Sequence, residues 1–317
     1  MSSAAGFGGP AAMKDRLLAG LVRLIGILPF RWAGRFGALV GRVLYRFDGR
    51  EVRNARVNLA LCFPAVNEIE RERMVQRNLA ETGRTLAEML RIWVGPRLDL
   101  TELVDENGFV EAGRALLARG RGLIFALPHL GNWELIGDST MRITPITALY
   151  RPPRLRFMDS IMRAGRARTG VEPVPIDRQG LKELHAALQR GEGIAILPDQ
   201  VPKSLGASGV LAPFFGHPAM TMTLISRLAR KHGAPVMFCC AVYDPATGRH
   251  RMHYFEGEAA IASASPEAAA AALNRGVERC VRKFPTAYQW TYRRFQIPGS
   301  REPNPYRGGR RSPRRSR

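Results

Sequence analysis

The sequence contains little cysteine, and its cysteines are not spaced to hold a metal or a disulfide framework. The four are Cys62, Cys239, Cys240 and Cys280, and no two of them form the Cys-x-x-Cys spacing typical of zinc sites. Cys239 and Cys240 are adjacent in an apolar segment, where a strand would point them to opposite faces. This distribution predicts buried free thiols in a reducing compartment.

The sequence also lacks a long uninterrupted apolar run near its N-terminus. The run from Leu17 to Pro29 is shorter than a comfortable membrane span of about 20 residues, and Arg23 interrupts it. It carries no convincing small-residue cleavage site, so it is not typical of a secretory signal peptide.

Residues 31–46 predict a basic amphipathic helix with an aromatic anchor. Its apolar face contains Trp32, Phe36, Leu39, Val40, Val43 and Leu44, and its basic face contains Arg31, Arg35, Arg42 and Arg46. This pattern is typical of a helix lying in a membrane interface, although a surface helix packed on the core can share it. We therefore expect residues 1–50 to be a membrane-associated segment, and the sequence leaves open whether it spans the bilayer or lies on it.

Acidic residues are scarce, with 27 Asp and Glu against 48 Lys and Arg and a formal net charge of +21 at pH 7. This charge favours nucleic acid, anionic lipid surfaces, phosphorylated substrates or acidic proteins as partners. Residues 307–317 carry part of the charge in a tail rich in Arg, Gly, Pro and Ser, which we expect to be disordered. A role in specific nucleic-acid binding is disfavoured because no recognisable reading motif is present.

The remaining pattern predicts an α/β fold. Residues 52–92 are expected to be helices broken at Pro64. From about residue 108, short apolar strands alternate with amphipathic helices. The expected strands are 122–127, 146–150, 193–198, 235–243 and 251–256, and the expected helices are 154–168, 181–190, 220–232 and 267–284. Such alternation predicts a mixed or parallel sheet flanked by helices.

The most informative pair of residues is His129 and Glu134. His129 follows the apolar strand 122–127, at a carboxyl end where open α/β sheets place their ligand sites. Asn132 can cap a following helix, so Glu134 falls in its first turn. We expect Glu134 to orient His129 as a general base for a hydroxyl, and the amides near residues 131–133 to face a developing oxyanion.

Polar residues also follow two other expected strands. Arg151 comes after strand 146–150, and Asp199 comes after strand 193–198. Arg163 and Arg166 lie on the helix between these strands. A carboxylate placed directly after an apolar strand needs a partner, and we expect an arginine to be the partner of Asp199. Parallel strands bring such carboxyl-end residues together, which predicts one assembled site.

Taken together, these segments resemble the bacterial lipid A biosynthesis acyltransferases of the lauroyl/myristoyl type. The resemblance extends from about residue 27 to about residue 306. The matching segments are Asn58 to Pro64, His129 to Glu134, Tyr150 to Pro152, Arg163 to Arg166, Pro198 to Gln200, Pro213 to Gly216, Ser226 to Arg230 and Tyr288 to Phe295.

The resemblance implies a glycerolphosphate-acyltransferase-like sandwich, with an acyltransferase domain over residues 51–306, held on the cytoplasmic face of the inner membrane. It implies acyl carrier protein as the donor and a hydroxyacyl group of a phosphorylated glucosamine disaccharide as the acceptor. His129 and Glu134 would be catalytic, and Arg166, Asp199, Arg151 and Arg163 would support them or bind the acceptor. No metal or organic cofactor is expected, because the thioester is already activated. An acyltransferase acting on another glycolipid, such as a phosphatidylinositol mannoside, is the alternative.

Overall fold

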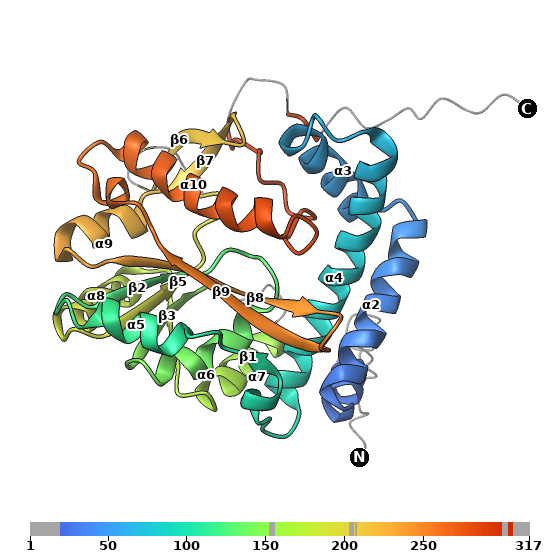
Figure 1. Cartoon of the computed structure of the whole chain (residues 1–317), viewed down its shortest axis with the longest axis horizontal. Coiled ribbons are helices and arrows are strands. Elements are labelled where there is room, and N and C mark those ends of the chain that lie inside the picture. The colour runs from blue at the N-terminus through green and yellow to red at the C-terminus, as the bar shows by residue number, and fades with distance from the viewer. Residues whose placement is uncertain (1–19, 152–155, 203–205, 207, 300–303, 307–317) are drawn as a thin grey trace, which may run out of the picture.

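The centre of the fold is a seven-stranded sheet with helices on both faces (Figure 1). The computed structural model describes residues 20–151, 156–202, 206, 208–299 and 304–306. The strand order is β1–β9–β8–β2–β5–β3–β4, and every neighbouring pair is parallel except β8 and β9. The strands are β1 Val104–Asp105, β2 Leu123–Ala126, β3 Ile146–Tyr150, β4 Glu172–Pro175, β5 Gly193–Ile196, β8 Val236–Asp244 and β9 Arg249–Glu256.

Alternating side chains of the central strands build two apolar layers. One layer packs under α5 (Phe109–Leu117) and α6 (Ile136–Met141). The other packs under α8 (Arg178–Gln189), α9 (Leu224–His232) and α10 (Pro266–Lys283). Cys239 lies in the first layer and Cys240 in the second, which confirms that they point to opposite faces. All four cysteines are buried and free.

The N-terminal helices form a separate wall beside the sheet (Figure 1). Residues 20–27 are helical, and they are followed by α2 (Phe30–Arg46), α3 (Arg50–Cys62) and α4 (Glu68–Val94). The helix start predicted near Asn67 is confirmed, because its side chain accepts a hydrogen bond from Glu70 N. α7 (Arg156–Ala167) packs against α4 and carries Arg166. Short 3₁₀ turns of the described residues are η1 Leu100–Glu102, η2 Trp133–Leu135 and η3 Ala259–Ala262.

α2 packs on α4 through its small residues and not through its large apolar ones. A Cβ on Gly37 would lie 2.2 Å from the carbonyl oxygen of Gly83, so any larger residue would push the helices apart. The apolar face predicted from the sequence consequently points outward, with Trp32 60% exposed and Leu44 53% exposed. A helix that spanned a bilayer would need more length and apolar character than any helix in the described residues possesses.

The strand and helix predictions hold except around residues 209–222. There the chain forms an antiparallel hairpin of β6 (Gly209–Phe214) and β7 (His217–Met222), so the helix expected from residue 220 begins only at Leu224. Phe215 and Gly216 connect the two strands, both with positive φ, as a tight two-residue hairpin turn requires. The two short strands β1 and β4 were also missed. The expected tail, residues 307–317, lies outside the described residues.

Candidate active site

Adjacent strand ends bring His129 and Asp199 together. β2 and β5 are neighbours in the sheet, and each is followed by one of these residues. The His129 Nδ1 atom lies 2.7 Å from Asp199 Oδ1, and the backbone N–H of His129 donates to Asp199 Oδ2 at 2.9 Å. Both side chains are nearly inaccessible to solvent. The carboxylate that orients the histidine is therefore Asp199, with two hydrogen bonds to one residue.

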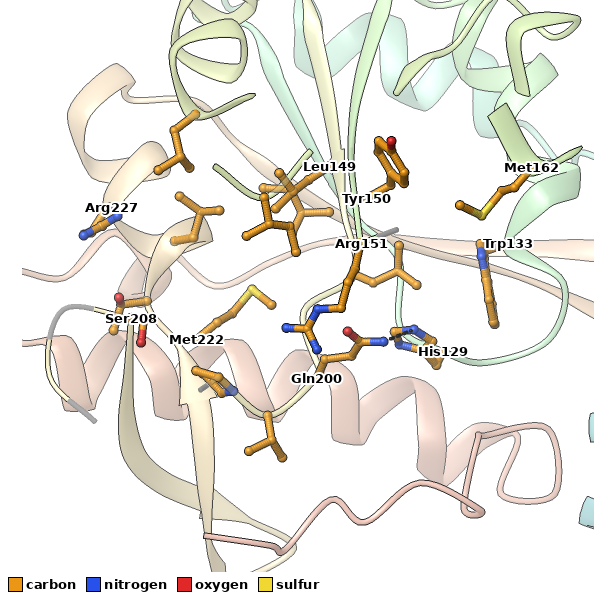
Figure 2. A pocket seen from close by; sticks show the side chains of 18 of the residues that line it. His129, Trp133, Leu149, Tyr150, Arg151, Met162, Gln200, Ser208, Met222 and Arg227 are labelled. Atoms are coloured by element: carbon orange, nitrogen blue, oxygen red, sulfur yellow. Dashed lines mark hydrogen bonds between the residues drawn. The ribbon is translucent and has the colours of Figure 1, made fainter. Parts of the chain in front are cut away.

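Burial alone would raise the pKa of Asp199, but the charge and hydrogen bonds of His129 and the more distant charge of Arg294 outweigh it and hold this pKa below its ordinary value. An ionised Asp199 accepts a proton-bearing Nδ1 and leaves the Nε2 lone pair of neutral His129 available. That lone pair faces the Gln200 side-chain amide, 3.1 Å away, as Figure 2 shows. Any other group that hydrogen-bonds to Nε2 has to displace this amide.

Glu134 is bonded to Arg166 and does not hydrogen-bond His129, so the expected His129–Glu134 contact is corrected. Arg166 Nε lies 3.1 and 3.2 Å from the two carboxylate oxygens of Glu134, and its Nη2 also bonds Oε1. The expected arginine partner of Asp199 is corrected in the same way. Burial would lower the pKa of Arg166, but Glu134 outweighs this and raises it, so the guanidinium stays charged.

The loop after His129 explains why Glu134 turns away. Gly131 has a φ of +64°, and a Cβ there would lie 2.1 Å from the carbonyl oxygen of Ala241, so only glycine fits. Asn132 N donates to Ala241 O at 2.8 Å, and Gly131 N donates to Ala287 O at 3.0 Å. The amides of Gly131 and Asn132 are thus occupied, which corrects the expectation that these two face an oxyanion. Asn132 precedes η2 but its side chain caps no amide; it bonds Glu88 of α4 at 3.1 Å.

The other expected arginines divide between the cavity wall and the scaffold. Arg151 follows β3 and, with Arg166, lines the cavity next to His129. Arg163 lies one turn before Arg166, exposed, with its Nη1 3.5 Å from the hydroxyl of Tyr150. It does not line that cavity. Of the supporting residues expected from the sequence, Arg151, Arg166 and Asp199 therefore gather around His129, and Arg163 lies beside them.

A cavity of about 640 Å³ opens from His129, a size within the usual range for ligand sites. Figure 2 shows His129, Trp133 and Gln200 at one end, Leu149 and Met222 in the middle, and Arg227 and Ser208 at the other end. Most of the wall is apolar. Its apolar residues include Leu149, Met162, Ile176, Leu181, Ile196, Leu197, Met222 and Leu224. The ring of Trp133 stands edge-on to the imidazole of His129, with centroids 4.9 Å apart.

Two apolar segments near this cavity, the strand β7 and the loop 213–216, contribute to it unequally. Met222 does, but Met220 is fully buried in the core. Phe214 and Phe215 are also core residues, packed with Phe63 and Trp290, so packing accounts for the loop 213–216. The site thus combines a carboxylate-oriented histidine, a fixed arginine and an elongated apolar cavity.

The family model described as bacterial lipid A biosynthesis acyltransferase matches residues 8–297 of this sequence. The chain belongs to this family. The protein is therefore an acyltransferase, and the resemblance drawn from the sequence motifs is confirmed.

Relatives of this acyltransferase have names that differ in the acyl group. The lipid A biosynthesis lauroyltransferase of Escherichia coli K12 is 29% identical over 290 residues, which cover 90% of this chain and 92% of the relative. The palmitoleoyltransferase of the same strain is 29% identical over 273 residues, covering 85% and 86%. The myristoyltransferase is 24% identical over 286 residues, covering 89% and 87%. Family membership therefore does not fix the acyl chain.

The Glu134–Arg166 pair predicts a strong energetic coupling. Its side chains are only 7% and 15% exposed, and removing one partner of a buried ion pair leaves an uncompensated charge. We expect Glu134→Gln or Arg166→Met alone to lower the free energy of unfolding by about 3–5 kcal/mol. The double variant should lose clearly less than the sum, as denaturant unfolding of all four proteins would measure.

The exposed pair Arg275–Glu258 is the matched control, with side chains 52% and 51% exposed. Its coupling energy should stay below about 1 kcal/mol. Equal coupling at the two pairs would show that Glu134 and Arg166 are not a buried unit.

Proposed function

We propose that this acyltransferase moves a fatty acyl chain from an acyl carrier protein thioester to the hydroxyl of an acyl group on a lipid A precursor, with His129 as general base. The observation that supports this most is His129 itself. Its Nδ1 is held by a buried carboxylate, and its Nε2 looks into a largely apolar cavity. That arrangement suits proton removal from an alcohol beside an acyl chain.

The reaction follows from these positions. The acceptor hydroxyl displaces the Gln200 amide and gives its proton to His129 Nε2 while its oxygen attacks the thioester carbonyl carbon. The tetrahedral oxyanion forms near Arg166 and Arg151, whose positive charges favour it. Collapse breaks the carbon–sulfur bond, and the imidazolium returns the proton to the leaving thiolate. Asp199 stabilises the imidazolium between these two proton transfers.

Glu134 and Asp199 therefore have different roles in the proposal. Asp199 selects the tautomer of His129 and keeps its ring in place. Glu134 fixes the position and the orientation of the Arg166 guanidinium, because both of its carboxylate oxygens accept hydrogen bonds from this planar group. A fixed arginine stabilises developing charge better than a mobile one, because it needs no reorganisation during the reaction.

We further propose that α2 holds the enzyme on the cytoplasmic face of the inner membrane by lying in the interface. Its exposed apolar residues and flanking arginines suit an anionic bilayer surface. A lipid acceptor and an acidic, soluble donor protein would then meet at the same face. The positive net charge of the chain favours both of them.

Three substitutions on the exposed face of α2 should release the protein from membranes. We expect Trp32→Ser, Phe36→Ser and Leu39→Ser together to weaken binding to vesicles containing one-third anionic lipid by about 100-fold, because each side chain contributes about 1 kcal/mol or more when it enters the interface. Vesicle co-sedimentation measures this. Ile69→Ser is the control, since Ile69 is an exposed apolar residue (71%) at the start of α4. Equal binding by the triple variant and the control would remove α2 from the proposal.

The proposed reaction is tested by lipid mass spectrometry of a strain that lacks this protein. We expect its lipid A to be lighter by one acyl chain, and a plasmid copy to restore the mass. The mass difference also identifies the chain length. Unchanged lipid A, together with loss of a chain from a different glycolipid, would overturn the proposed acceptor.

A further inference from the structure

Glu88 is a buried carboxylate that the proposed reaction does not use. It lies on α4 and is only 1% exposed. Its Oε2 atom accepts a hydrogen bond from the side-chain amide of Asn132 at 3.1 Å and lies 3.1 Å from Nε2 of His250 on β9. Its other oxygen faces α2, where a Cβ on Gly34 would lie 2.5 Å from it. The carboxylate is therefore enclosed by α2, by the sheet and by the loop that follows His129.

The side chain of Asn132 depends on Glu88 for its hydrogen bond. Asn132 is fully buried, and its Oδ1 has no hydrogen-bond partner within the described residues. The side chain is thus held through Nδ2, which donates to Glu88. Removing the carboxylate would leave a buried amide without a partner, and such a group costs free energy until it moves to find another one.

Asn132 lies between the two halves of the candidate active site. Its backbone N–H donates to β8 and its side chain donates to α4, so it is held from two sides. Just before it in the chain is His129. Just after it are Trp133, whose ring stands edge-on to the His129 imidazole, and Glu134, which bonds Arg166. A displaced Asn132 would therefore disturb the surroundings of both the histidine and the arginine.

We propose that Glu88 is a positioning residue for the acyl transfer, because its carboxylate holds Asn132 and so fixes the loop that follows His129. Glu88 does not line the cavity and acts only through Asn132. The inference rests on the proposed role of His129. It predicts that losing one hydrogen bond on α4 slows the chemical step, since small displacements of catalytic groups are costly.

The test is kcat and KM of Glu88→Met and of Asn132→Leu, each at the same folded concentration as the wild type. The first variant removes the acceptor of the hydrogen bond, and the second removes its donor. We expect either one to lower kcat about 10- to 100-fold, with KM for the proposed donor changed by less than about threefold. The double variant should lose no more than the weaker of the two single variants, because both changes break the same contact. Whichever variant folds decides the matter, and a kcat within about threefold of the wild-type value overturns the proposal.

Glu88→Gln separates hydrogen bonding from packing. Its amide oxygen can still accept from Asn132, so kcat should return to within about threefold of the wild-type value. His250→Phe is the matched control, because His250 contacts the same carboxylate oxygen at the same distance but lies outside the residues that line the cavity. Phenylalanine keeps the ring contacts with Phe30 and Tyr243. This variant should lower thermal stability and leave kcat unchanged. A loss of kcat equal to that of Asn132→Leu would assign the effect to the fold as a whole and overturn the proposal.

A readout without substrate separates this inference from the proposed function. The ring of Trp133 lies close enough to the His129 imidazole to shift the C–H proton signals of that imidazole in nuclear magnetic resonance spectra. We expect these signals to move in Glu88→Met and Asn132→Leu and to stay in place in His250→Phe. If the wild-type protein fails to acylate the lipid A precursor, the proposed function falls, but the spectra still test Glu88. Unmoved signals in a protein that acylates the precursor would overturn the inference alone.

Discussion

Replacing His129 with alanine is expected to reduce acyl transfer by about 10⁴-fold, because the variant loses the proposed general base, which would remove the acceptor proton and return it to the leaving thiol. The reduction should appear in kcat, while KM for the proposed donor, an acyl carrier protein thioester, changes little. The measurement is mass-spectrometric counting of acylated precursor in vesicles, with the variant at the same folded concentration as the wild type.

His185→Ala provides the control for this experiment. His185 lies on α8 and pairs with His232 at 2.8 Å, outside the residues that line the cavity. It should retain wild-type turnover. A folded His129→Ala protein that retains more than about one-tenth of the wild-type rate would show that another group is the base.

The sequence predicted which residues gather at the site better than it predicted which of them hydrogen-bond to each other. His129, Asp199 and Arg151 each follow a strand, and strand ends can be recognised from apolar runs. Which strands are neighbours cannot be read from one sequence, because the order is set by long-range packing. Glu134 is five residues from His129 and Asp199 is seventy, so proximity along the chain favoured the wrong carboxylate. β2 and β5 are adjacent, and this topology reverses the choice.

Other differences between the prediction and the structure have separate causes. The strand β7 was missed because the segment 220–232 was taken as one continuous helix, although Met220 and Met222 are two residues apart, which is the spacing of one strand face. Residues 288–295 were recognised only as a family segment, because backbone atoms make their contacts with the loop after β2, and residue types do not reveal such contacts. The outward apolar face of α2 was predicted from its periodicity. Its glycine contact with α4 needed the structure, since Gly37 and Gly83 are far apart in the sequence.

Asp199→Asn should have the second large effect on acyl transfer, because Asp199 is the carboxylate that bonds His129 Nδ1. The asparagine amide would offer a donor to Nδ1, so neutral His129 would carry its proton on Nε2 and lose its capacity as a base. We expect kcat to fall by about 10³- to 10⁴-fold, the size seen when a triad carboxylate is replaced by its amide. The variant keeps the shape of the side chain, so substrate binding should change less than threefold.

Glu134→Gln is the decisive comparison for Asp199→Asn, because both replace a buried carboxylate by an amide near His129. Glu134 acts on Arg166, so its loss should reduce kcat by about 10- to 100-fold through weaker stabilisation of the oxyanion. It should leave the Nδ1 proton of His129 and the acidic limb of the pH profile unchanged. Loss of that proton in Glu134→Gln, with its retention in Asp199→Asn, would restore Glu134 as the residue that orients the histidine.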